Sequence, residues 1–443
     1  MSLLDASPSP FCRLLARQVR DQARRPALND VTFRELGERI AARAEALRHI
    51  DGLCGLALGN GPSFVESFFA LRALGIPVLS LDQGTTPETC RRVRGAWMLR
   101  RDGEILNTGP VEPPPAGTDI VKMTSGSTFD PRAACFTEEA LVEGVEHIRL
   151  AMDLSAKDVV LIAIPLSHSY GFDSGLLSLA AIGTPLVLQN DVLPAALLKG
   201  FRTSTFFPAV PALIRALGRV EWPSGLALRS VICASAPLAQ EDADAFFAAS
   251  GLRVKQFLGA TEAGGIAFES GEPMPGTVGH PLPGVRIELH DDGLRVHSKA
   301  NRFALLPGGE LSMPWVETGD RGEWMPDGRL RLLGRASLTA NIGGFKVDLG
   351  ALDAFLRGLP GVAEAAALPL EDAARGQRIV AWVESSQRTP SDILAACRER
   401  LQPREVPSEV RVVEQLPRNG RGKLDRAALL APQSHKEHEG VPS

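Results

Sequence analysis

Short apolar runs alternate along most of the chain with segments whose apolar residues recur at helical spacing. The segment FRELGERIAARAEAL predicts a helix from Phe33 to about Leu47, because its apolar residues fall on one helical face. GLCGLALGN, at 52–60, is a short apolar run that ends in a glycine-containing turn, as a buried strand does. Further helices are predicted at 65–75, 194–200 and 211–218, and further strands at 76–82, 158–166, 184–190 and 204–210. Short buried strands separated by helices indicate an α/β domain with mostly parallel sheets and covering helices.

The pattern changes after GRLRLLGRASL, at 328–338. Beyond it, FKVDLGALDAFLRGLPGV and RIVAWVESS predict a compact α+β unit of about a hundred residues. We therefore expect a large N-terminal domain at 1–334, a small C-terminal domain at 335–430 and a disordered polar tail at 431–443. The stretch from Cys90 to Thr118 is basic and then proline-rich, so we interpret it as a linker.

Composition narrows the class of protein. The chain has 443 residues, 44% of them hydrophobic, and a formal net charge of -4, which indicates a soluble globular protein with no electrostatic reason to bind nucleic acid or an anionic membrane. Its six cysteines lie far apart, so neither a zinc site nor a disulfide framework is suggested. No secretory signal or membrane-spanning run is found, and we expect a cytoplasmic protein whose partners are small molecules or proteins.

One short stretch suggests a ligand. TSGSTFDPR, at 124–132, combines small residues, which let the backbone approach a ligand, with hydroxyl and N–H donors suited to a phosphate chain. It is not a Walker A loop, because no Lys-Ser or Lys-Thr pair follows. Taken alone, such a run is most often an ordinary loop.

The loops that follow the apolar runs carry further polar residues. In open α/β sheets, ligands bind beyond the carboxyl ends of the strands, so these loops are where a site is expected. Five of them are unusual: IPLSHSYGF, ICASAPL, KQFLGATEAGG, WVETGDRGEW and LPRNGRGKLDR. Each alone has an ordinary structural explanation, and a single histidine such as His168 is more often a satisfied interior residue than a catalyst. Their order along the chain is more specific than any one of them.

That order resembles the adenylate-forming superfamily of acyl-CoA synthetases, adenylation domains and luciferases, over nearly the whole chain. The family's TSGSTGxPKG loop is matched by Thr124 to Thr128 and by Pro131. Its YGxTE, TGD, GRxD and C-terminal GK motifs stand here as LGATE, TGD, GRAS and GRGKLDR. The resemblance implies an AMP-forming acid–thiol ligase that uses ATP and Mg²⁺ to convert a carboxylic acid to an acyl-adenylate and passes the acyl group to CoA. It also implies that the C-terminal domain moves between the two half-reactions.

The resemblance assigns a role to each matched position. Lys423 would bridge the substrate carboxylate and the phosphate, Thr261 would contact the α-phosphate, and Glu262 would hold Mg²⁺. The ATP-binding residues would be Thr124, Ser125, Gly126, Ser127, Thr128, Arg132, Ser235, Ala236, Pro237, Leu258, Asp320 and Arg335. The acid would lie near His168, Gly259, Ala260 and Gly264, and the thiol would enter past Gly343 and Gly344. Asp320 would accept both ribose hydroxyls.

Several positions depart from the family pattern. Phe129 replaces a glycine of the phosphate loop, Leu258 replaces an adenine-stacking tyrosine and Ser337 replaces a hinge aspartate. Ser169 stands where amino-acid-activating relatives have an aspartate for the α-ammonium group, which argues against an α-amino acid. The small residues near Glu262 leave room for a planar or extended group, so we expect an aryl or medium acyl acid. Two alternatives stay open. One is transfer to the phosphopantetheine of a separate acyl carrier protein, and the other is a non-catalytic nucleotide-binding protein.

Overall fold

The computed structural model describes residues 2–430 apart from 102, 125–131, 291–292, 309, 312–313, 336–338, 343–344, 373–375, 402, 404 and 420–423. The chain divides into two compact units, which we describe separately. Unit 1 comprises Met1–His290, Leu294–Thr318 and Gly322–Leu332, and unit 2 comprises Asp291–Gly293, Gly319–Arg321 and Leu333–Ser443. No described helix is long and apolar enough to span a bilayer.

The first sheet of unit 1 has nine described strands with a parallel centre. In spatial order they are β15 (His280–Pro281), β14 (Gly264–Phe268), β13 (Val254–Ala260), β12 (Ser230–Cys233), β11 (Phe206–Ala209), β9 (Val160–Ile162), β10 (Leu186–Leu188), β1 (Pro26–Leu28) and β2 (Val31–Thr32). The strands from β13 to β1 pair in parallel, and the strands at both edges pair antiparallel. The parallel centre aligns the carboxyl ends of β9, β11, β12 and β13 along one edge.

The second sheet of unit 1 has eight described strands. Their order is β19 (Glu310–Leu311), β18 (Ala304–Leu306), β8 (Ala133–Phe136), β7 (Ile120–Met123), β4 (Val78–Ser80), β3 (Cys54–Ala57), β5 (Trp97–Arg100) and β6 (Ile105–Asn107). The strands β7, β4, β3 and β5 pair in parallel. The interpretation of 90–118 as a linker was wrong, because β5 and β6 lie in it. Its strands are short and flanked by charges, so the periodicity is weak there.

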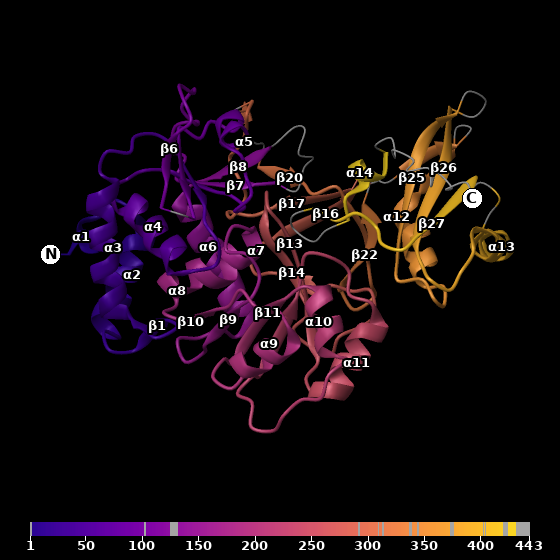
Figure 1. Cartoon of the computed structure of the whole chain (residues 1–443), viewed down its shortest axis with the longest axis horizontal. Helices are drawn as coiled ribbons and strands as arrows, with labels where there is room; N and C mark the ends of the chain where they lie inside the picture. The colour runs from indigo at the N-terminus through magenta and orange to yellow at the C-terminus, as the bar shows by residue number, and fades with distance from the viewer. Residues whose placement is uncertain are drawn as a thin grey trace, which may run out of the picture. The chain divides into compact units, whose positions relative to one another are not determined.

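Helices cover these sheets. Those of unit 1 are α1 (Leu3–Ala6), α2 (Pro10–Asp21), α3 (Phe33–Leu47), α4 (Pro62–Ala73), α5 (Pro87–Arg92), α6 (Glu138–Met152), α7 (Ser169–Gly171), the π-helix η1 (Phe172–Leu177), α8 (Ser178–Ala181), α9 (Pro194–Gly200), α10 (Pro211–Leu217) and α11 (Gln240–Ser250). Leu161 packs with side chains of α9, α10 and α11 on one face of the nine-stranded sheet, whereas Val160 and Ile162 join the central core with α4, α6 and η1. Alternate residues of a strand point to opposite faces, so β9 is buried on both sides. Figure 1 shows α9 and α10 near β11, and α11 next to α10.

The remaining strands of unit 1 are β16 (Arg286–His290), β17 (Gly293–His297) and β20 (Trp315–Glu317), and the pair β21 (Asp320–Trp324) and β22 (Leu330–Arg335) follows them in the chain. The five-stranded sheet of unit 2 contains β23 (Thr339–Ile342), β24 (Phe345–Asp348), β25 (Glu364–Asp372), β26 (Gly376–Glu384) and β27 (Glu409–Val413). Its helices are α12 (Leu349–Arg357), α13 (Pro390–Arg400) and α14 (Arg426–Leu430). Side chains of α12 and α13 form a separate apolar core with this sheet.

The strands and helices predicted from periodicity are confirmed. The predicted helix at Phe33–Leu47 is α3, and the other three predicted helices contain or overlap α4, α9 and α10. The predicted strands contain β3, β4, β9, β10 and β11. Thr32 caps α3 because its hydroxyl accepts from the Glu35 N–H while the Glu35 carboxylate accepts from the Thr32 N–H.

Candidate functional site

The carboxyl ends of the parallel strands in unit 1 bring together many of the residues that the sequence singled out. His168 follows β9, Ser235 follows β12, and Thr261 and Glu262 follow β13. Because these three strands run parallel in one sheet, the residues after them share one edge. In the eight-stranded sheet, Thr124 follows β7, which runs parallel to β4 and β3.

Hydrogen bonds join the loops at the carboxyl edges of the two sheets. Asn60, after β3, accepts from the Leu166 N–H at 2.7 Å and donates to the Ile164 carbonyl at 2.8 Å. Asp82, after β4, accepts from the Ser167 hydroxyl at 2.9 Å. These bonds hold the loop after β9 against the loops after β3 and β4, so the two edges form one continuous region.

His168 stands at the start of the helical segment that follows β9. Its Nε2 lies 3.4 Å from Oδ1 of Asp82, and the side chains of both are partly exposed, 24% and 33% respectively. The Phe172 N–H donates to the His168 carbonyl, which closes the first turn of the helix. His168 therefore has a carboxylate beside it and is partly open to solvent.

The segment at 235–237 follows the carboxyl end of β12. Ser235 has φ of +76°, in the left-handed region that residues with a side chain seldom adopt. Ser235 and its two neighbours Ala236 and Pro237 are exposed. Non-glycine residues held in this conformation cluster at ligand-binding positions, and the small side chains leave the backbone accessible.

Thr261 and Glu262 occupy the turn between β13 and β14. The Ala263 N–H donates to the Ala260 carbonyl at 3.1 Å, and the Arg302 N–H donates to the Glu262 carbonyl at 2.9 Å. The Glu262 carboxylate is half-buried and makes no hydrogen bond or ion pair with the described residues. Burial lowers the pKa of Arg302, and the nearby Glu262 charge opposes that shift.

The glycines beside Glu262 have conformational reasons to be glycine. Gly264 has φ of +67°, which favours glycine. A Cβ on Gly259 would lie 3.0 Å from the Gly264 carbonyl oxygen. Packing of the β13–β14 turn thus accounts for both glycines, whether or not an acid binds there. Ala260 is half-buried at the end of β13, and Leu258 is buried in the central core.

The phosphate-loop segment begins where β7 ends. The backbone N–H of Thr124 donates to the Arg132 carbonyl at 2.9 Å, and the Thr124 hydroxyl does so at 3.3 Å. These bonds close the loop between β7 and β8 at its base. Ser125, Gly126, Ser127, Thr128, Phe129 and Pro131 lie outside the described residues.

Other predicted site residues fall in or near unit 2. Asp320 begins β21, is half-buried and belongs to unit 2, and Arg335 ends β22. Lys423, Gly343, Gly344 and Ser337 lie outside the described residues, so their assignments stay predictions. Of the predicted residues of unit 1, the structure describes all but Ser125, Gly126, Ser127 and Thr128.

Sequence reasoning missed four residues near this edge. Asn60 and Asp82 end the apolar runs that precede them, and a polar residue at the end of a buried strand is the signal that could have found them. Lys122 is a lone cation in the apolar strand β7, and Asp173 lies inside the π-helix. Lys122, which is buried, and Asp173, whose side chain is 13% exposed, form an ion pair that no local pattern indicates.

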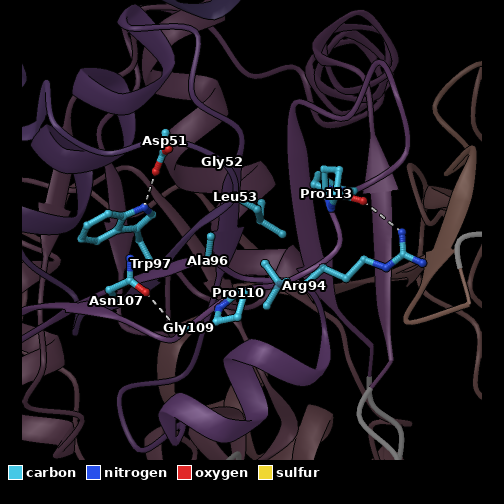
Figure 2. Close-up of a pocket in the computed structure, with 12 residues that line it drawn as sticks. Asp51, Gly52, Leu53, Arg94, Ala96, Trp97, Asn107, Gly109, Pro110 and Pro113 are labelled. Atoms are coloured by element: carbon cyan, nitrogen blue, oxygen red, sulfur yellow. Dashed lines mark hydrogen bonds between the residues drawn. The ribbon is translucent and has the colours of Figure 1, made fainter.

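The surface hollow in Figure 2 lies at the other edge of the eight-stranded sheet. Leu53 and Ala96, which line it, come just before β3 and β5, at the amino ends of these strands. The Trp97 indole donates to Asp51 at 2.9 Å, and Arg94 donates to the Pro113 carbonyl at 3.0 Å. The hollow is therefore separate from the loops that carry His168 and Thr124.

A metal would depend on a ligand as well as on the protein. Among the described side chains, no three of the His, Cys, Asp and Glu residues converge on a point that could hold an ion. Mg²⁺ commonly binds through one or two carboxylates together with substrate phosphates and waters. The Glu262 carboxylate, half-buried at the carboxyl edge, fits that arrangement.

Comparison with known proteins agrees with the fold. The model of the AMP-binding enzyme family matches residues 94–302, and that of the AMP-binding enzyme C-terminal domain matches residues 351–423. The structure of ATP-bound MatB from Rhodopseudomonas palustris superposes with a TM-score of 0.83, at 19% identity, over 94% of this chain and 97% of that one. The chain thus has the two-part fold of the adenylate-forming enzymes, and the predicted fold class is confirmed.

Sequence relatives agree with this class. A probable 2-succinylbenzoate–CoA ligase of Mycobacterium tuberculosis is 32% identical over 327 residues, which cover 70% of this chain and 83% of the relative. A probable CoA ligase of Humulus lupulus is 29% identical over 357 residues, which cover 70% of this chain and 65% of the relative. The chain belongs to the AMP-binding enzyme family, as its motifs predicted.

Proposed function

We propose that this protein is an AMP-forming acid–thiol ligase, which converts a carboxylic acid to an acyl-adenylate with ATP and then transfers the acyl group to CoA. The observation that carries the proposal is the shared carboxyl edge, where His168, Ser235 and Glu262 follow parallel strands of one sheet. Membership of the AMP-binding enzyme family supports the same chemistry.

Each group at this edge has a chemical role in adenylation. A carboxylate has no good leaving group, and joining it to AMP creates one while pyrophosphate departs. Because the acid and the triphosphate are both anionic, the site needs cations and donors directed at the charge that develops on the α-phosphate. Lys423 supplies an ammonium for this role and Thr261 a hydroxyl. Glu262 would hold Mg²⁺, which neutralises phosphate charge when bound.

The acid that we propose is an aryl or medium acyl acid without an α-ammonium group. Ser169 follows His168 and offers no negative charge for an ammonium. Its hydroxyl oxygen is buried and has no hydrogen-bond partner among the described residues. The relative from Mycobacterium tuberculosis is named for 2-succinylbenzoate, an aromatic acid, which supports this class.

The first test is acid-dependent pyrophosphate release with ATP and Mg²⁺, using hydroxylamine as the trapping nucleophile and a panel of aryl, fatty and amino acids. Lys423→Ala should lower release by about 10²- to 10³-fold, as loss of a single transition-state donor does. Lys157→Ala is the matched control, because this exposed lysine precedes β9 at the opposite edge. Wild-type release from Lys423→Ala would reject its role. ATP binding with no release for any acid would favour a non-catalytic nucleotide-binding protein.

Glu262→Gln tests the metal assignment. The amide keeps the shape of the side chain and removes its charge, so half-maximal release should need more Mg²⁺ and the maximal rate should fall. Glu241→Gln, on the exposed start of α11, is the control. A Mg²⁺ titration that superimposes on the wild-type curve would remove Glu262 as the ligand.

The thiol acceptor has two candidates. CoA is our proposal, and the alternative is the phosphopantetheine of an acidic acyl carrier protein. Thioester formation with CoA alone supports the first, and formation only with a carrier protein supports the second. The names of the two sequence relatives, both CoA ligases, favour CoA.

A further inference from the structure

The strand that leads into the phosphate loop contains a buried cation. Lys122 lies in β7 between apolar neighbours, two residues before Thr124, and its side chain is 2% exposed. Its Nζ is 2.5 Å from Oδ1 of Asp173. The rings of Phe136 and Phe172 lie 5.3 Å and 4.9 Å from the ammonium, so aromatic faces fill most of its remaining surroundings.

Core stability does not explain this pair. Burying two charges is costly, and apolar residues of similar volume usually stabilise a core as well as a buried ion pair does. The strand needs only a side chain that packs against Phe136 and Phe172. The pair therefore calls for a reason that an apolar contact could not supply, such as a fixed geometry between the two segments it joins.

Those two segments lead to different loops of the candidate site. Asp173 is the second residue of η1, five residues after His168. A π-helical turn is rare and occurs mostly at functional positions. One end of the ion pair thus belongs to the strand of the phosphate loop, and the other belongs to the helix that begins at His168.

The same helix is also fastened to the strands of the nine-stranded sheet. The Tyr170 hydroxyl donates to the Ile232 carbonyl in β12 at 2.9 Å. Its ring stacks on Phe257 of β13, with centroids 5.9 Å apart and an angle of 20° between the planes. β12 leads to Ser235 and β13 leads to Glu262, so the segment from His168 to Asp173 contacts three strands that carry site residues.

We propose that the Lys122–Asp173 ion pair is a positioning link, which holds the carboxyl end of β7 and Thr124 at a fixed place relative to His168 and so aligns ATP with the acid. A contact between two charged groups at one distance defines relative position more sharply than apolar packing does. Because adenylation requires the carboxylate to meet the α-phosphate in line, a small displacement of either partner lowers the rate strongly. This inference rests on the proposed adenylation function.

The test compares two single variants, Lys122→Met and Asp173→Asn, with the apolar double variant Lys122→Met/Asp173→Leu. All three should lower kcat for pyrophosphate release by about 10- to 100-fold, while KM for ATP changes by less than about threefold. The double variant should have a thermal midpoint equal to or above that of the wild type, which separates positioning from stability. Lys122→Arg, which retains the cation, should recover part of kcat. The control Glu45→Leu/Arg48→Met removes an exposed ion pair and should change neither rate nor midpoint.

Tyr170 provides a second readout, because it is the single tyrosine of the chain. Incorporation of 3-fluorotyrosine gives one ¹⁹F resonance that reports on the helix after His168. In the wild type, ATP with Mg²⁺ should shift this resonance, since the link carries changes at the phosphate loop to the helix. In the apolar double variant the resonance should start from a different position and lose its response to ATP.

The outcomes separate the two proposals. A double variant with wild-type kcat and a wild-type response of the resonance to ATP would overturn the positioning link. If the wild type releases no pyrophosphate with any acid, the proposed function fails, and the ¹⁹F comparison alone decides the link. If the double variant does not fold, the response of the wild-type ¹⁹F resonance to ATP tests the link. A resonance that ATP does not shift contradicts the link. A shift that Lys122→Arg partly retains supports it.

Discussion

Two carboxylates, one just before strand β9 and one in the helical segment after it, differ in their hydrogen bonds and in the direction of their pKa shifts. At its amino end, Asp158 accepts hydrogen bonds from the Ser155 N–H and hydroxyl, from the Thr205 hydroxyl and from two nitrogens of Arg229. Burial raises the pKa of Asp158, but these bonds outweigh it and bring the pKa to about 2. Beyond the carboxyl end, Asp173 accepts from Lys122, and burial raises its pKa although the Lys122 charge opposes the shift.

The difference shows that a partner cation alone does not make a buried carboxylate favourable. Asp158 precedes β9, Thr205 precedes β11 and Arg229 precedes β12, so one edge of the sheet collects donors around a single acid. At the carboxyl edge, by contrast, acids such as Asp173 and Glu262 accept few hydrogen bonds from the described residues. Such groups are costly for stability and are expected where ligands bind.

The largest effect on the free energy of unfolding is expected at Asp119 and Glu138, two acids that pair with Arg72. Arg72 donates to Glu138 at 2.6 Å and to the Ile76 carbonyl at 2.8 Å, and it also pairs with Asp119, which precedes β7. Arg72→Met leaves the fully buried Glu138 without its cation, and should lower the free energy of unfolding by about 3–5 kcal/mol. Denaturant unfolding measures the loss. A loss of less than about 1 kcal/mol would show that the stability of the fold does not depend on the ion pairs of Arg72.

The apolar double variant at the carboxyl end should behave differently. Lys122→Met/Asp173→Leu is expected to leave the free energy of unfolding unchanged or raise it by up to about 1–4 kcal/mol, because both buried charges are removed together. The same denaturant measurement applies. A loss of unfolding free energy as large as that of Arg72→Met would mean that the Lys122–Asp173 pair stabilises the fold as much as the ion pairs of Arg72 do.

Lowering the pH should change the stability contributions of Asp158 and Asp173 in opposite directions. The folded pKa of Asp158, about 2, lies below the ordinary value of an aspartate, about 3.8, so its contribution of about 2 kcal/mol is present above pH 4 and is lost as the pH falls toward 2. The stability difference between wild type and Asp158→Asn should therefore shrink over that range.

Asp173 provides the opposite slope. Because its folded pKa is raised, the folded state holds a proton at pH values where the unfolded state has released it. The stability of the wild type relative to Asp173→Asn should therefore rise as the pH is lowered toward 4. Unfolding midpoints between pH 3 and pH 7 measure both differences, and slopes of the same sign would contradict the comparison.

The smallest expected effect is at the surface. Arg48 and Glu45 of α3 form an ion pair whose side chains are both more than half exposed. Arg48→Met should change the free energy of unfolding by less than about 1 kcal/mol, because solvent screens the pair. A larger loss would show that ion pairs in this chain contribute regardless of burial.

The sequence predicted the helices and strands more fully than it predicted which distant residues contact one another. The helix at Phe33–Leu47 and strands such as β9 follow from periodicity, which depends on neighbouring residues only. The strands β5 and β6 were missed because basic and proline-rich neighbours hide their short apolar runs. Gly264 is predicted to lie near the acid, and its positive φ favours glycine whether or not an acid binds there.

By itself, the sequence determined the alternating α/β class and the loops that carry Thr124, His168 and Glu262, because strand periodicity, turn residues and motif spacing are local properties. The tertiary structure alone decided that Asp82 faces His168 and that Lys122 pairs with Asp173. It also decided that Asp158 accepts from Thr205 and Arg229, which precede β11 and β12. These pairings join residues about 50 to 90 positions apart, and they depend on strand order and on how the two sheets meet, which no local pattern specifies.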